Sequence, residues 1–223
     1  MKKRHTAILI VAAACVAGSG LRASGPTMIS VRIGDTFEQV VRASSFPVVV
    51  SSDIPTHDAV GSGATWVKKP AVIIQFNDPK YGFRLPPTTF ASIGYMHNKV
   101  DTIATSPMLK KLSYDQATTL VATLQNQFMA SGWELDDGTT WFNLTPAGRE
   151  TLHEQIRLGN QGYRKEVSLR APEKYSMTFR LRCAEQCDNR NGLDRYLIDI
   201  GIGQDFEFAI QTRKRQREKT INQ

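Results

Sequence analysis

Residues 113–132 read SYDQATTLVATLQNQFMASG and decide the fold, because they predict one long helix with a single apolar face. Ser113 and Gln116 have the spacing of a capping box at its start, and Gly132 supplies a stop signal at its end. The apolar residues that share one stripe of this helix are Ala117, Leu120, Val121, Leu124 and Phe128. A stripe only one face wide predicts a helix that lies on a sheet, not inside a helical bundle.

A second amphipathic helix is predicted to begin after Thr145, with Pro146 at its first position and Gly159 at its end. Leu152 and Ile156 fall on its inward face. The predicted strands cover residues 28–33, 46–50, 66–67, 71–76, 90–95, 100–105, 133–135, 140–144, 167–169, 175–183 and 196–202, with a last strand through Phe206, Phe208 and Ile210. We also predict a short helix over residues 37–44 and a loop over residues 51–63.

Turn sequences join most of these strands into hairpins. His97-Asn98, Asp136-Asp137-Gly138 and Asn191-Gly192 each separate two strand-like segments, and residues 66–67 and 71–76 are expected to pair around Lys68-Lys69-Pro70. Two amphipathic helices among antiparallel hairpins predict an α+β fold, with the helices packed on one face of an antiparallel sheet or sheets. This domain would cover residues 27–211, and the pattern allows a boundary between two subdomains near residues 107–112.

The start of the chain has the layout of a bacterial export signal. Residues 2–4 are basic, residues 7–14 form a short apolar run, and small alanines precede Cys15. The run is shorter than the roughly 20 apolar residues that span a bilayer. We therefore predict that residues 1–14 are a signal peptide, followed by a flexible tether over residues 15–26 that is rich in Gly, Ser and Ala.

The residues around Cys15 resemble the lipobox of bacterial lipoproteins, although Ala12 stands where that pattern prefers Leu. The resemblance implies that the signal is cut before Cys15 and that the thiol receives lipid. Several acyl chains, at about 0.8 kcal/mol per buried methylene, would hold the protein firmly to a membrane. Val16 replaces the Asp that is typical of inner-membrane retention, which points to the outer membrane. The alternative is a plain secretory signal, cut after Ala17 or Ala23, and a soluble periplasmic protein.

The net charge of +7 resides at the two ends of the chain. Between the basic residues of the signal and the tail at 212–223, the body carries 20 basic and 20 acidic residues. A neutral body does not predict a nucleic-acid partner. The tail is basic and polar, and a solvated end is its simplest interpretation, with anionic lipid or an acidic partner as the alternative.

Cys183 and Cys187 remain as an even pair in an oxidising compartment once Cys15 carries lipid. We predict a structural disulfide that closes a loop of about five residues and contributes roughly 2 kcal/mol. Reduced or catalytic thiols are the alternative. Their spacing is one residue longer than a redox motif, and a second pair or a nearby His is missing for a zinc site. We therefore expect neither a metal nor a cofactor.

Patterns typical of catalysis are incomplete in this sequence. Residues 61–63 lack the spacing of a serine-hydrolase elbow, and His153-Glu154 lacks the second His of a zinc-protease helix. Asp199 is the most unusual acidic residue, and an ion pair with Arg180 or Arg182 across the last hairpin explains it. We predict that the protein is not an enzyme, and keep an enzyme with an unrecognised site as the third alternative.

Aromatic residues cluster in a segment that we predict to be extended and exposed. Tyr81, Phe83 and Phe90 lie near Pro86 and Pro87. Aromatic side chains are favoured anchors at protein interfaces. These three residues are therefore the candidate partner-binding residues, and packing over the core is the alternative.

Residues 78–87 (DPKYGFRLPP), 100–107 (VDTIATSP) and 141–146 (WFNLTP) resemble segments of small exported lipoproteins of proteobacteria. Some of those are immunity proteins against lipase or other toxins that type VI secretion delivers to the periplasm. The resemblance implies a binding role and carries over no functional residue. We predict a membrane-anchored periplasmic module that binds a protein, most concretely an immunity protein that occludes such a toxin. An envelope-assembly or secretion-accessory lipoprotein is the main alternative.

Overall fold

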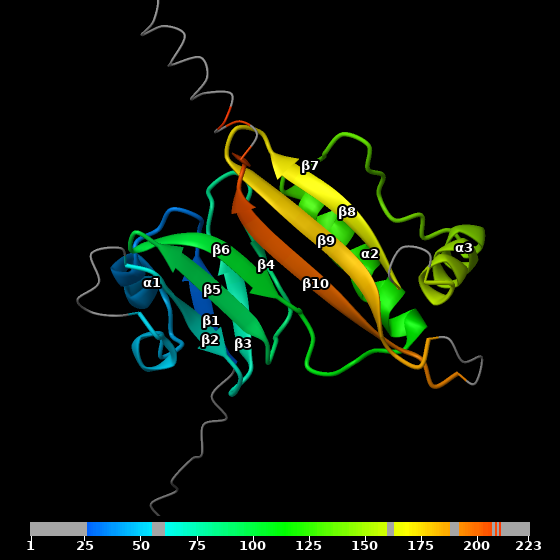
Figure 1. Ribbon diagram of the computed structural model, residues 1–223, viewed down its shortest axis with the longest axis horizontal. Coiled ribbons are helices and arrows are strands. Elements are labelled where there is room, and N and C mark those ends of the chain that lie inside the picture. Colours follow the sequence, from blue (N-terminus) through cyan, green and yellow to red (C-terminus); the bar gives the residue numbers. More distant parts are fainter. Residues whose placement is uncertain are drawn as a thin grey trace, which may run out of the picture.

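The computed structural model describes residues 26–54, 61–159, 163–187, 192–206, 208 and 210. Within these residues the fold is α+β, as the sequence predicts, with α-helices packed on two sheets (Figure 1). The predicted signal peptide, Cys15, almost all of the tether and the basic tail lie outside the described residues.

A seven-stranded antiparallel sheet runs through the whole molecule. Its strands, in spatial order, are β2 (Gly63–Val67), β5 (Ala91–Met96), β6 (Lys99–Thr105), β10 (Arg195–Gln204), β9 (Tyr175–Glu185), β8 (Arg164–Ala171) and β7 (Glu134–Leu135). The pairing of β6 with β10, from Ile103↔Ile202 to Thr105↔Ile200, joins the N-terminal half of the chain to the C-terminal half. The sequence gives no local signal for this pairing, because the two strands are far apart along the chain.

A second sheet and one short helix complete the N-terminal half. Its strands are β1 (Thr27–Val31), β3 (Val72–Phe76) and β4 (Phe83–Arg84), with β1 and β3 parallel. Helix α1 (Phe37–Ala43) begins at Thr36, whose side chain accepts a hydrogen bond from the backbone N–H of Gln39. This helix and the β5–β6 hairpin at His97-Asn98 confirm the sequence predictions; both turn residues have positive φ, which such a tight hairpin requires.

Helices α2 (Tyr114–Ala130) and α3 (Pro146–Arg157) lie on one face of strands β8–β10 (Figure 1). The capping box of Ser113 and Gln116 is present, and Phe128 of α2 packs edge-on against Phe179 of β9, with ring centroids 5.2 Å apart. Thr145 caps α3, as predicted. The buried apolar residues of both halves form one hydrophobic cluster. A division into subdomains near residues 107–112 stays a prediction.

A buried carboxylate also connects the two halves. Asp78, in the turn after β3, accepts hydrogen bonds from the backbone N–H groups of Lys80 and Tyr81, each at 2.9 Å. Its other oxygen accepts from the hydroxyl of Tyr175 at 2.9 Å and from Lys174 Nζ at 3.3 Å, both at the start of β9. Burial raises the pKa of Asp78, but these hydrogen bonds outweigh it and lower the pKa to about 2.

Residues 46–50 do not form the predicted strand. Phe46 and Val48 are buried, and the N–H of Val48 donates to the C=O of Phe46 at 2.8 Å, which closes a tight turn around Pro47. The chain then enters the short 3₁₀ helix η1 (Val49–Ser51). The predicted strand does not form because Pro47 has no backbone N–H to donate to a neighbouring strand. Phe46 and Val48 are buried as parts of a turn instead.

Three further strand predictions are wrong. The hairpin predicted for residues 133–135 and 140–144 does not form. Strand β7 pairs with β8 instead, and residues 140–144 lie against α2, where Phe142 and Gln125 exchange hydrogen bonds. Strands β2 and β3 belong to different sheets, because β3 takes β1 as its parallel partner. Phe206, Phe208 and Ile210 are helical, not a final strand. In the first two cases a contact distant in sequence outweighs the local pattern.

Candidate functional site

The structure separates the three candidate aromatic residues. Tyr81 and Phe83 are only 5% and 4% exposed, so the prediction that they are exposed is wrong. The turn at Asp78 directs them inward, where both pack against Trp133, whose indole N–H donates to the C=O of Tyr81 at 2.9 Å. Phe90 remains 51% exposed, directly before β5, and is the one member of the trio that a partner can reach.

The remaining predicted residues have clear structural roles. Cys183 and Cys187 form the predicted disulfide. Asp199 lies opposite Arg180 in register, yet its carboxylate accepts hydrogen bonds from Arg182 Nε at 2.5 Å and from the Ser106 hydroxyl at 2.6 Å. The predicted cross-strand ion pair is thus present, between β10 and β9, with a serine from beyond β6 as an added donor.

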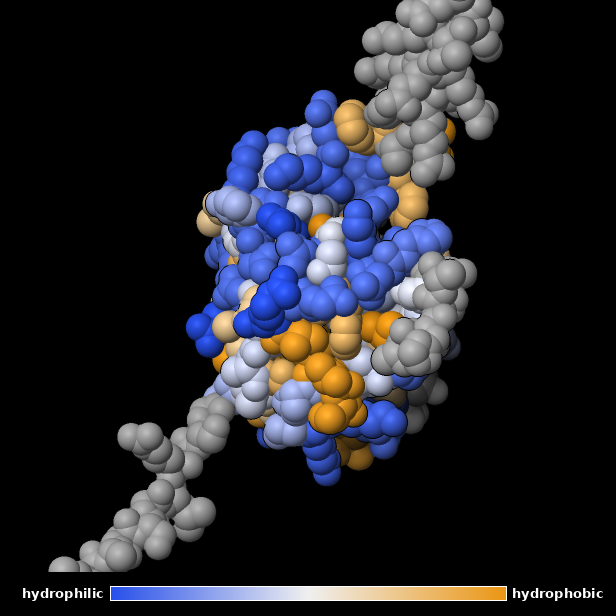
Figure 2. All heavy atoms as spheres, turned by 90° about the vertical axis from the view of Figure 1, so that its left-hand side faces the viewer, coloured by the Kyte–Doolittle hydropathy of each residue, from blue (hydrophilic) through white to orange (hydrophobic). Residues whose placement is uncertain are grey.

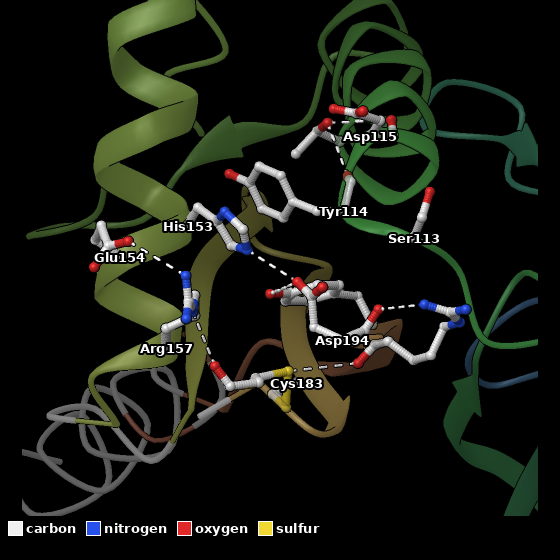
Figure 3. A network of polar contacts seen from close by, with 12 residues as sticks. Ser113, Tyr114, Asp115, His153, Glu154, Arg157, Cys183 and Asp194 are labelled. Atoms are coloured by element: carbon white, nitrogen blue, oxygen red, sulfur yellow. Dashed lines mark hydrogen bonds and ion pairs between the residues drawn. A yellow bond between two sulfur atoms is a disulfide. The ribbon is translucent and has the colours of Figure 1, made fainter. Parts of the chain in front are cut away.

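A polar network joins α3 to α2 and β10 (Figure 3). His153 Nε2 lies 3.0 Å from Asp194 Oδ2, and the Tyr196 hydroxyl donates to the same oxygen at 2.7 Å. The ring of Tyr114 stacks on the His153 ring at a centroid distance of 4.0 Å, and its hydroxyl donates to the C=O of Arg149 at 2.5 Å. No local pattern in the sequence indicates this network, because its members come from three distant segments.

The network lowers the pKa of its carboxylate and raises the pKa values of its two tyrosines. Burial raises the pKa of Asp194, but the hydrogen bonds from Tyr196 and His153 outweigh this and lower it overall. Burial raises the pKa of Tyr114, and burial together with the Asp194 carboxylate raises that of Tyr196. The Asp194 carboxylate orients His153 through one ring nitrogen, while Tyr114 covers one face of the ring. This arrangement locks α3 in place.

An open pocket of about 360 Å³ borders this network. Its walls include Tyr114, His153, Pro146 and the ion pair between Arg149 and Asp115, at 2.7 Å. Arg149, which lines the pocket, therefore already has a counter-ion in Asp115. Within the described residues, no group of three or more His, Cys, Asp or Glu side chains is arranged to hold a metal ion.

An exposed apolar surface lies at the opposite end of the molecule, where η1 packs beside β2. Val50 is 83% exposed and Val49 is 59% exposed, and Trp66 of β2 is also exposed. Figure 2 views the end of the molecule that carries α1 and shows an apolar area with polar residues above it. We call Val49, Val50 and Trp66 the apolar surface.

Short hydrogen bonds hold this surface rigidly to the sheet. The Ser52 hydroxyl lies 2.7 Å from the C=O of Val48 and 2.7 Å from the Thr65 hydroxyl, which in turn lies 3.0 Å from the hydroxyl of Tyr95. The Ser52 side chain thereby fixes the last turn of η1 against β2. The two exposed valines are consequently presented on a rigid support, which reduces the entropy lost when a partner binds.

Asp53 makes a second attachment between η1 and β2. Its carboxylate accepts the backbone N–H of Ala64 at 2.6 Å and the indole N–H of Trp66 at 3.4 Å. These hydrogen bonds, with that of Ala64 the strongest, lower the pKa of Asp53 despite slight desolvation. The charged carboxylate thus helps to orient the Trp66 ring where η1 meets β2.

Comparisons with protein-family models, curated proteins and solved structures gave no match to this chain. None of the helices in the described parts of the chain is long and apolar enough to cross a membrane.

Proposed function

We propose that this chain is a protein-binding module whose partner docks on the apolar surface. The observation that carries the proposal is the exposure of Val49, Val50 and Trp66 on a hydrogen-bonded support. Two adjacent valines and a tryptophan left in water cost free energy that burial under a partner recovers, at about 25 cal/mol per Å² of apolar area. Contiguous exposed apolar patches with a polar rim are typical of protein interaction sites.

The most concrete form of this function is immunity to a toxin delivered to the periplasm. The resemblance of residues 78–87, 100–107 and 141–146 to exported lipoproteins, some of which are immunity proteins, supports this form. A toxin such as a lipase would be neutralised by occlusion, with an interface of about 1,600 Å² in total covering its active site. The apolar surface would supply the central contacts, and Phe90 is an additional exposed aromatic residue directly before the neighbouring strand β5.

We further propose that Cys15 anchors the protein by lipid to the periplasmic side of the outer membrane. The support is the lipobox-like sequence, Val16 after the cysteine, and a disulfide of the kind that persists outside the cytoplasm. Labelling of cells with a radioactive palmitate should mark the wild-type chain and leave Cys15→Ala unmarked. Labelling of neither chain, together with recovery of the protein in the soluble periplasm, would favour a plain secretory signal.

The binding proposal is tested by capture from native envelope extract with the tagged chain, comparing wild type, Val50→Asp and Leu109→Asp. Leu109 is a matched control because it is also an exposed apolar residue and lies outside the apolar surface. We expect one partner, near a one-to-one ratio, on wild type and Leu109→Asp and its loss from Val50→Asp. A captured hydrolase that wild type inhibits would support immunity, whereas subunits of a membrane machine would support envelope assembly.

A further inference from the structure

A second pocket is lined by residues of α3. Helix α3 and strand β2, which carries Trp66, lie at opposite ends of the molecule (Figure 1). Its volume is about 320 Å³, and it is enclosed by residues 140–145, α3 and β8. Trp141 and Asn143 contribute from the loop, Gln155 from α3 and Lys165 from β8. A mixed apolar and polar lining of this size fits one side chain of a ligand together with its hydrogen-bond partners.

The backbone of β8 presents an open edge beside this pocket. The C=O of Tyr163 accepts a hydrogen bond from the N–H of Cys183, so the backbone groups of the odd-numbered residues of β8 point to β9. On the other side, the C=O of Ser168 accepts a hydrogen bond from the N–H of Asp136, which follows β7. The even-numbered residues therefore direct their N–H and C=O groups to the edge. Strand β7 ends at Leu135, and no group of the described residues hydrogen-bonds the edge-facing backbone of Glu166.

Hydrogen bonds from other segments reach the edges of β1, β4 and β2. On β1, the Ser45 hydroxyl accepts the N–H of Met28; on β4, a glutamine of α2 donates to the C=O of Arg84. On β2, Ala64 exchanges hydrogen bonds with Asp53. Proteins usually cover or block strand edges, because unpaired edges accept further strands. The β8 edge is thus a place where a strand can be added.

Lys165 gives this edge a chemical preference. Alternation along β8 puts its side chain on the same face as the buried Val167 and Leu169, where it lines the pocket with Trp141. Among the residues that the structure describes, Lys165 has no ion-pair partner; the neighbouring Glu166 is paired with Arg180 on the other face of the sheet. An ammonium group without a counter-ion therefore faces the pocket.

We propose that the β8 edge binds an extended peptide segment of a partner protein as an additional strand, with an acidic side chain opposite Lys165 in the pocket. A residue opposite Lys165 would form a non-hydrogen-bonded pair, in which side chains lie closest. Main-chain hydrogen bonds would supply affinity and the pocket specificity. This inference does not depend on the proposed function, because it concerns a different surface.

Charge identifies a separate partner as the occupant. Residues 1–25 of this chain contain no acidic residue, and residues 211–223 contain one acidic and five basic residues. Neither terminus therefore complements Lys165. A second copy of β8, paired antiparallel with Lys165 opposite Lys165, would bring two ammonium groups together, which is also unfavourable.

The test uses the full chain and a capped peptide, Thr-Val-Thr-Glu-Thr-Val-Thr, in calorimetric and NMR titrations. Peptides with Gln or Lys in place of Glu measure the charge preference. We expect about tenfold tighter binding for Glu than for Gln, with no binding for Lys, and amide shift changes along residues 164–168. N-methylation of the peptide amides that face β8 should abolish binding, whereas N-methylation of the outward amides should leave it intact.

Two protein variants complete the test. Lys165→Met should remove the preference for Glu over Gln, and Lys99→Met, an exposed lysine of the β5–β6 hairpin, should retain it. Equal binding of the Glu and Gln peptides, or no binding of any peptide at millimolar concentration, overturns the proposal. If the chain forms dimers as its concentration rises, and the peptide no longer causes the amide shift changes in those dimers, a second copy occupies the edge. That result also overturns the proposal.

Discussion

Replacing Asp78 by asparagine tests whether one buried carboxylate holds the two halves of the molecule together. The side chain is almost inaccessible and accepts four hydrogen bonds, two of them from the start of β9. Its pKa falls from the ordinary value of 3.8 to about 2 in the folded protein. Because one unit of pKa corresponds to about 1.4 kcal/mol, ionised Asp78 should stabilise the folded state by about 2 kcal/mol at neutral pH.

The pH dependence follows from the direction of this shift. A carboxyl whose pKa is lowered by folding contributes fully above its unfolded value near 3.8 and loses its contribution as the pH falls towards 2. The free energy of unfolding, measured by urea titration, should therefore be about 2 kcal/mol lower for Asp78→Asn at pH 7. The difference should shrink steadily between pH 4 and pH 2.

Asp137→Asn, in the exposed turn after β7, is the matched control and should change stability by less than about 0.5 kcal/mol at every pH. A deficit of Asp78→Asn that is the same at pH 7 and pH 2 would refute the reasoning. It would show that the loss comes from packing of the amide and not from the ionised carboxylate.

Three further predictions concern stability. Replacing Cys183 and Cys187 by serine should lower the free energy of unfolding by roughly 2 kcal/mol, and a reductant should bring wild type to the same value. His153→Ala removes the hydrogen bond to Asp194 and the stacking on Tyr114. The free energy of unfolding, measured by thermal unfolding, should therefore fall by about 1–3 kcal/mol. Val48→Ala should cost about 1–3 kcal/mol, whereas Val50→Ala should stay within about 0.5 kcal/mol; equal effects in urea titration would contradict the orientation of η1.

Local signals in the sequence predicted much of the fold correctly. The capping box at Ser113 and the stripe that ends at Phe128 predicted α2, and Thr145-Pro146 predicted the start of α3. The turn at His97-Asn98 predicted a hairpin. These features succeed because caps, stripes and tight turns depend on residues that are neighbours along the chain.

Contacts between distant residues account for the errors and omissions. Nothing near Val72 indicates that β3 takes β1 as a parallel partner, and nothing near Trp133 indicates that β7 pairs with β8. The proline-rich segment around Tyr81 and Phe83 predicts exposed side chains, but both rings pack into a space formed by α2 and Trp133.

Local sequence patterns do not predict most of the candidate site. Val49 and Val50 belong to a β-branched run that is typical of a buried strand, and only the turn around Pro47 shows that they project outward. The open edge at Glu166 depends on where β7 ends. Of the predicted binding residues, Phe90 alone remains accessible.

The most direct test of a binding role for the apolar surface is a calorimetric titration of the purified partner against wild type and Val50→Asp. We expect the aspartate to weaken binding by about 30-fold or more, as loss of a central interface contact does, while the free energy of unfolding stays unchanged. Equal affinity of the two proteins for the partner would contradict it and would place the interface elsewhere on the molecule.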